Sequence, residues 1–303
     1  MLTRPLGLVK AISPLAIPRT PARLPVLVRH ASTARAPLLP DALKSVGAKV
    51  NESNRAEISL KRFWKTVGIM QQSDTTYWIT LDGRPLRTPS GTRLAVPADR
   101  QILAMLIANE WENQKEALKA PGLPMTSLAS RALDGFMGPE RETTREGVLN
   151  ELFRYLDTDT TLFAADHPST LVRLQAEHWD PLHAWYKAEH GIDIKTYDTL
   201  VLGGGNKFKQ SDETKRVLSD AVKGWDAWQI AALERATYTT KSFLIAFALV
   251  SGRLTADQAA RAAQVEVSSQ IELWGEVEDS HDVDYQDIRR QLGSVVCLLA
   301  KTA

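Results

Sequence analysis

Hydrophobic and polar positions alternate between residues 61 and 97, which predicts a set of short β-strands. Tyr77, Ile79 and Leu81 point to one face of a strand, while Trp78 and Thr80 point to the other. Asp82-Gly83 follows directly, and this dipeptide favours a two-residue hairpin because both positions tolerate positive φ. We therefore expect an antiparallel meander whose strands span residues 61–70, 77–81, 84–88 and 92–96.

From residue 98 the apolar period lengthens from two residues to about four, which is typical of an amphipathic helix. Leu103, Ile107 and Trp111 fall on one stripe of this helix. We expect the stripe to pack on the open face of the meander, with Trp111 as a core anchor. The small β-rich unit would then span residues 61–120.

Beyond residue 121 the pattern is almost entirely helical. Thr255 and Gln258 fit a capping box, Pro181 interrupts one long apolar pattern, and Gly191 and Gly252 stand where helices should end. The expected helices span residues 140–156, 169–190, 212–231, 233–251, 255–276 and 285–301. The fold class is therefore α+β, with a small N-terminal β-rich domain and a larger all-α domain over residues 121–303.

Residues 1–40 differ in composition from the rest of the chain. They carry six Lys or Arg residues, no acidic residue and seven of the 15 prolines. An Arg-rich, acid-poor head is typical of a mitochondrial transit peptide, and prolines break any continuous apolar core of a secretory signal. We expect a transit peptide at residues 1–40, a linker at residues 41–60 and a protein of the mitochondrial matrix.

Composition excludes several classes of protein. The longest strongly apolar run, residues 243–250, is far shorter than the ~20 residues of a membrane-spanning helix. A single cysteine, Cys297, excludes an internal disulfide and any multi-cysteine metal site. Without the basic head the chain has five more acids than bases, which argues against general nucleic-acid binding. The sequence also lacks an obvious self-complementary stripe, so we expect a monomer.

Two segments invite a chemical interpretation. The Gly203-Gly204-Gly205-Asn206-Lys207 segment lacks the spacing of a phosphate-binding loop, and we expect no cofactor. Residues 276–287 are the second segment, and they combine His281 with six acids: Glu276, Glu278, Asp279, Asp282, Asp284 and Asp287. Such a cluster could bind a partner or stabilise the next helix, and alternatively Asp279, His281 and Asp282 could serve a metal-dependent matrix enzyme.

Four stretches, taken in order, resemble the assembly chaperones of mitochondrial ATP synthase that attend the α subunit of F₁-ATPase. These stretches are residues 62–65 with 81–89, residues 109–114, residues 156–160 with 177–181, and residues 265–270 with 274–282. The resemblance implies a non-enzymatic chaperone with a β-rich and a helical domain. It also implies that the protein binds the unassembled α subunit and shields the surface that later meets the β subunit.

The resemblance points to Glu266 as a functionally important residue. Val267, Ile271 and Trp274 form an i, i+4, i+7 stripe, which predicts that Ile271 and Trp274 are core anchors. Glu266 lies at the edge of this stripe, near small residues that would let another chain approach. The expected partner-binding residues are Glu266, Gln270, Ala263 and Ala259.

Overall fold

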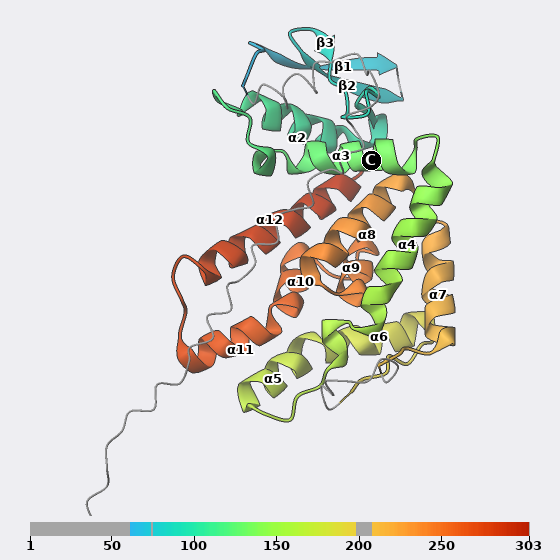
Figure 1. The fold of residues 1–303 in the computed structure, drawn as a ribbon, viewed down its shortest axis with the longest axis vertical. Helices are drawn as coiled ribbons and strands as arrows, with labels where there is room; N and C mark the ends of the chain where they lie inside the picture. Colours follow the sequence, from blue (N-terminus) through green and yellow to red (C-terminus); the bar gives the residue numbers. More distant parts are fainter. Residues whose placement is uncertain (1–60, 74, 198–207, 303) are drawn as a thin grey trace, which may run out of the picture. The chain divides into compact units, whose positions relative to one another are not determined.

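The computed structural model describes residues 61–73, 75–197 and 208–302 (Figure 1). All of them belong to one unit of the chain, Lys49–Ala303. The predicted transit peptide, the linker and the Gly203–Lys207 segment lie outside the described residues. The division into two domains near residue 120 stays a prediction.

The N-terminal part is an antiparallel sheet of β1 (Val67–Ser73), β2 (Thr76–Leu81), β3 (Arg84–Pro85) and β4 (Ala95–Pro97). Asp82 and Gly83 turn the chain between β2 and β3 with φ values of 49° and 77°, as the hairpin pattern predicts. The meander is only partly formed, because β4 pairs with β2 rather than with β3. Strand β3 is only two residues long, although Leu86 continues the pairing by donating to the carbonyl oxygen of Ile79 at 2.8 Å and accepting from the N–H of Leu94 at 2.9 Å.

Helix α2 (Gln101–Glu112) follows a short 3₁₀ turn at Ala98–Arg100 and packs against the sheet. Its buried stripe contains Leu103, Ile107 and Trp111. The indole of Trp111 is 3% exposed, lies 5.0 Å from the ring of Trp64 and donates to Thr126 Oγ1. Trp111 therefore lies in the core, where the sequence places it.

The C-terminal part consists of helices around a fully apolar central helix, α9 (Phe243–Val250), whose eight residues are all buried. It packs against α8 (Ala227–Thr240), α4 (Arg141–Asp157), α10 (Ala256–Ala263) and α12 (His281–Leu299). The remaining helices are α3 (Pro124–Phe136), α5 (Ser169–His178), α6 (Asp180–His190), α7 (Asp212–Lys223) and α11 (Val265–Trp274), with 3₁₀ turns at Ala120–Gly122 and Thr160–Leu162.

Several predicted helix boundaries are confirmed. Thr255 and Gln258 form the capping box that starts α10, and Gly191 ends α6 in the left-handed conformation. The helix expected over residues 169–190 is divided into α5 and α6, as Pro181 suggests. Among the described residues, no helix combines the length and apolar character that crossing a membrane requires.

Other boundaries are wrong. Helix α3 was not expected, and the break placed near residue 232 lies inside α8; the chain instead leaves α8 at Lys241, with φ of 55°. The helix expected over residues 255–276 is two helices, because the backbone departs from helical geometry at Gln264. This break changes which residues of the second helix are buried.

Candidate functional site

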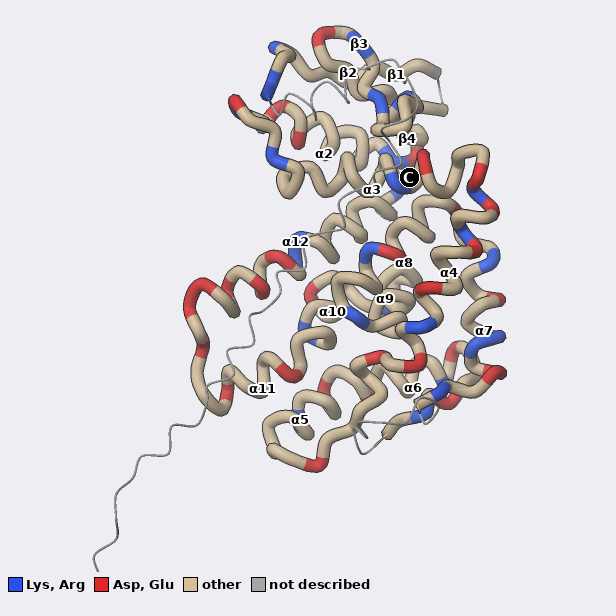
Figure 2. Tube along the Cα trace, viewed as in Figure 1, with Lys and Arg blue, Asp and Glu red and all other residues tan. Residues whose placement is uncertain are grey.

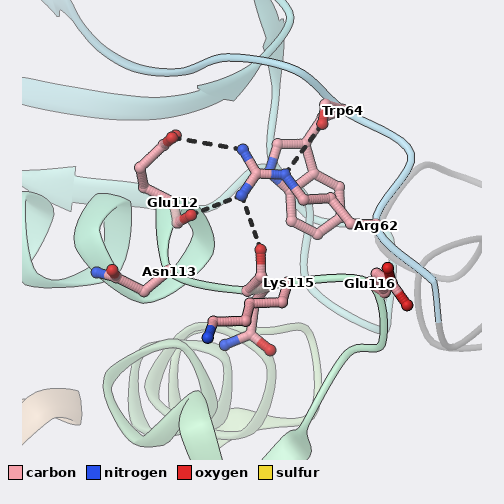
Figure 3. Close-up of a pocket in the computed structure, with 7 residues that line it drawn as sticks. Arg62, Trp64, Glu112, Asn113, Lys115 and Glu116 are labelled. Atoms are coloured by element: carbon pink, nitrogen blue, oxygen red, sulfur yellow. Dashed lines mark hydrogen bonds and ion pairs between the residues drawn. The ribbon is translucent and has the colours of Figure 1, made fainter.

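Arg62, in the first stretch that carries the resemblance, joins the start of the described chain to the end of α2. Its guanidinium donates to the carbonyl oxygens of Glu112 at 2.6 Å, Gln114 at 2.7 Å and Trp64 (Figure 3). It also donates to the carbonyl oxygen of Lys65. A further bond to the Glu112 carboxylate gives every guanidinium N–H an acceptor. The shallow hollow around Arg62 therefore offers no free guanidinium donor to a ligand, and its residues serve the fold.

Glu110, in the second stretch, caps the start of α3. Its carboxylate accepts hydrogen bonds from the backbone N–H of Met125 at 2.6 Å and of Thr126 at 2.9 Å, and from the Thr126 hydroxyl. Burial raises the pKa of Glu110 despite these bonds. This stretch therefore holds the β-rich part against the first helix of the helical part.

The third stretch is also used inside the protein. Asp159 is fully buried and accepts hydrogen bonds from the N–H groups of Thr161 and Leu244, so it joins a 3₁₀ turn to the start of α9. Trp179 donates its indole N–H to the carbonyl oxygen of Ala262 over 2.8 Å. Both residues have structural roles that explain their presence.

The fourth stretch is different because most of it faces solvent. Residues 272–286 are exposed except for the half-buried His281. Trp274 is 78% exposed, Val277 58% and Val283 57%. Figures 1 and 2 show this stretch as the end of α11, the connecting loop and the start of α12, with acidic positions along it. Among the described residues, no hydrogen bond or ring contact uses the side chains of Trp274, Val277 and Val283.

The predicted partner-binding residues have different environments. Glu266 and Gln270 are exposed on α11, and Ala263 is half-buried at the end of α10. Ala259 is fully buried, because α10 packs against α9 and α12, so the prediction that Ala259 contacts a partner directly is wrong.

The predicted core anchors on α11 also need correction. Trp274 is the most exposed large apolar residue described, and Ile271 is only half-buried. The buried residues of α11 are Val265 and Ser269, and Ser269 exchanges a hydrogen bond with Thr170 on α5. Helix α11 packs mainly on α5, and among the described residues Trp274, at its end, remains largely exposed.

The described residues supply no ligand set for the metal-dependent alternative. Within the ranges that the structure describes, no group of three His, Cys, Asp or Glu side chains could hold a metal ion. His281 instead uses Nδ1 to accept the N–H of Val277 at 3.0 Å. Asp279 lies in the loop and Asp282 on α12, so their nearness in sequence does not produce a ligand set.

Sequence reasoning missed four exposed apolar residues beside Trp274. They are Leu273, Val277, Val283 and Tyr285. The sequence does contain a pattern that could have predicted their exposure. In residues 273–285 acidic residues lie among the apolar ones, and the apolar residues do not form a helical stripe that a core could bury. A segment of this composition cannot hide its apolar side chains in a core.

The chain is similar in sequence to a known family of chaperones. The family model described as ATP12 chaperone protein matches residues 61–187. The mitochondrial protein atp12 of Schizosaccharomyces pombe is 33% identical over 244 residues, covering 79% of this chain and 82% of that protein. The mitochondrial protein ATP12 of Saccharomyces cerevisiae is 30% identical over 275 residues, covering 80% and 84%.

The fold also matches a solved structure of this kind. The crystal structure of Atp12 from Paracoccus denitrificans superposes with a TM-score of 0.64 at 27% identity, and the match covers 80% of this chain and 99% of that one. Sequence and fold therefore agree over most of the described residues. The chain belongs to the ATP12 chaperone protein family.

Proposed function

We propose that this protein is an assembly chaperone of the mitochondrial ATP synthase. It binds the unassembled α subunit of F₁-ATPase in the matrix, shields the surface that later contacts the β subunit, and releases the subunit into the assembling catalytic head. Membership of the ATP12 chaperone family supports an assembly role. The observation that carries the proposal is the stretch from Leu273 to Tyr285, where five large apolar or aromatic side chains are exposed; among them, Tyr285 is partly covered by the guanidinium of Arg289.

The physical problem that such a chaperone solves is aggregation. A subunit that will be buried on two sides in a ring exposes a large apolar surface while it is free, and large exposed apolar patches associate non-specifically. A chaperone that covers this surface lowers the concentration of the aggregation-prone form. Release needs no ATP hydrolysis, because the larger interface with the β subunit competes for the same surface.

We place the client-binding face around Glu266, Gln270 and Ala263. Glu266 lies in the first turn of α11 with its side chain exposed, and no ion pair uses it among the described residues. A carboxylate in this position is available to an arginine of the client, and the gain depends on how fully the pair is desolvated. Ala263 supports a close approach at the junction of α10 and α11.

Two observations support a location in the mitochondrial matrix. The two yeast relatives carry the word mitochondrial in their names. Residues 1–40 of this chain have the basic, acid-free composition of an imported protein. We propose that the protein acts there as a monomer.

An aggregation assay tests the proposed function. Purified α subunit is diluted from denaturant, and light scattering is followed with the full chain or with an equal amount of serum albumin. We expect the full chain at a stoichiometric ratio to suppress scattering, and albumin to have no effect. Equal scattering in both samples would overturn the proposal.

A further inference from the structure

Exposed large apolar side chains are concentrated in one short segment of the described chain. Five of the fourteen such residues lie between positions 273 and 285: Leu273, Trp274, Val277, Val283 and Tyr285. The other nine are distributed over residues 63–296 on several elements. A local concentration marks an interaction surface, whereas isolated exposed apolar residues are normal. Residues 273–285 are called the hairpin surface below.

The hairpin surface is held in shape by its own hydrogen bonds. Val277 donates its N–H to His281 Nδ1 at 3.0 Å and accepts the N–H of His281 at 3.1 Å. Gly275 closes the end of α11 by donating to Ile271, and it adopts φ of 87°, a conformation that glycine tolerates. The loop therefore presents Val277 outward in a defined conformation, which reduces the entropy lost on binding.

All Asp, Glu, Lys and Arg residues within positions 273–285 are acidic, and Arg289, further along α12, lies over the Tyr285 ring at 3.4 Å. No Lys or Arg occurs between Arg261 and Arg289. Carboxylates on the borders of this segment are paired: Glu272 with Arg173, Asp257 with Arg289, and Asp287 with Arg290. The five carboxylates within residues 273–285 make no ion pair within the described residues: Glu276, Glu278, Asp279, Asp282 and Asp284.

Helix capping explains only part of this charge. Asp282 and Asp284 lie in the first turn of α12, where they complement the helix dipole. Glu276 and Glu278 lie in the loop before that turn, and the dipole effect fades beyond the end of a helix. Capping also gives no reason for Trp274 or Val277 to face solvent.

We infer that the hairpin surface docks a basic, apolar segment of the client, with Trp274 and Val277 as apolar anchors and Glu276 and Glu278 facing its Lys or Arg side chains. This inference rests on the proposed function, because it takes the occupant to be part of the α subunit. Charge complementarity selects the sign of the partner, and the apolar residues require that it also bring apolar side chains. The surface begins at the end of α11, the helix whose first turn holds Glu266.

Two pairs of double variants of the full chain test the inference. Trp274→Ser/Val277→Ser removes the apolar anchors, and its control, Ile102→Ser/Met105→Ser, removes two exposed apolar side chains from α2. Glu276→Lys/Glu278→Lys reverses the charge, and its control, Glu146→Lys/Glu189→Lys, makes the same net change at exposed sites elsewhere. Circular dichroism establishes that all four variants are folded.

Each variant is measured against two probes. One is purified α subunit, retained on the immobilised chain. The other is a fluorescent amphipathic peptide of Leu and Lys, compared by anisotropy with the same peptide in which Gln replaces Lys. We expect both hairpin variants to bind either probe about tenfold or more weakly, as for loss of interface anchors, with both controls within about twofold of the natural chain. The Gln peptide should bind weakly throughout.

The outcomes separate this inference from the proposed function. If hairpin and control variants retain α subunit equally, the docking surface is overturned while the chaperone proposal stands. The natural chain could instead bind the Lys peptide through the hairpin surface but retain no α subunit. That result would overturn the α subunit as the client and would support the hairpin surface as a site for basic, apolar segments. If neither probe binds the natural chain, both proposals are overturned.

Discussion

Trp179, at the junction of α5 and α6, donates its indole N–H to the carbonyl oxygen of Ala262 in the last turn of α10. Carbonyls in the last turn of a helix lack the backbone donor that a longer helix would supply. The indole satisfies one of them immediately before the break at Gln264. Helix α11 begins at the next residue, Val265, with Glu266 in its first turn, so this bond lies where the candidate client-binding face starts.

Replacing Trp179 by Phe should destabilise the protein. The change leaves a buried carbonyl without its indole donor, which costs about 1–3 kcal/mol, and it also removes apolar contact area. Urea unfolding followed by circular dichroism measures the loss. Trp185→Phe is the matched control, because Trp185 is half-buried on α6 and packs mainly through its ring. An equal loss in the two variants would show that the bond to Ala262 contributes nothing specific.

Trp111→Arg should act through stability rather than through binding. The indole is buried against Trp64, so the substitution places a charge in an apolar core at a cost of several kcal/mol. Thermal unfolding should shift strongly downward, and Trp111→Phe, which keeps the site apolar, should lose less. An unchanged melting temperature for Trp111→Arg would refute the assignment of Trp111 to the core.

Lowering the pH should reduce the stability of the protein through the imidazole of His183. Burial lowers the pKa of His183 below its ordinary value of 6.5, and its Nε2 atom has no hydrogen-bond partner. Between pH 6.5 and the lower folded pKa, the unfolded chain binds a proton that the folded chain refuses, so stability falls as pH falls through this window. Above pH 6.5 both states are neutral and the contribution is constant.

His183→Leu removes this contribution, so the fall in melting temperature between pH 7.5 and 5.5 should be smaller than in the natural chain. Burial also lowers the pKa of His190, so part of the pH dependence of stability remains in the variant. Identical slopes for His183→Leu and the natural chain would contradict the account.

Glu266→Lys should leave the fold intact and abolish protection of the client. The side chain is exposed, so the expected change in stability is limited to about 0.3–1 kcal/mol from a cation near the start of α11. Light scattering of diluted α subunit measures protection, and Glu189→Lys on α6 is the charge-matched control. Loss of helical signal in Glu266→Lys would show a structural role instead.

The sequence predicts an element well when its capping residues, turn residues or apolar stripe match the residues that the structure places at helix ends, turns and the core. Thr255 and Gln258 cap α10, Asp82-Gly83 turns β2 into β3, and the stripe of α2 covers the sheet with Trp111 inside. In each case the pattern over a few residues determines the structure. Helix α3 was missed because Gly135 and several small polar residues obscure its stripe.

Trp274 shows why the candidate site was harder to predict. A large aromatic residue on an i, i+4, i+7 stripe usually faces a core, and this rule assumes one continuous helix with a neighbour on that side. The break at Gln264 and the packing of α11 mainly on α5 both arise from tertiary structure, which local pattern does not contain. The same limitation applies to Ala259, whose small size suits helix packing as well as it suits a partner.

Co-expression is the most direct test of whether the protein binds the unassembled α subunit of F₁-ATPase. The tagged full chain is expressed together with the α subunit and, in a parallel experiment, together with the β subunit. We expect soluble recovery of α at about one copy per chain, little recovery of β, and loss of α with Glu266→Lys. Recovery of neither subunit, or equal recovery of both, would contradict this expectation.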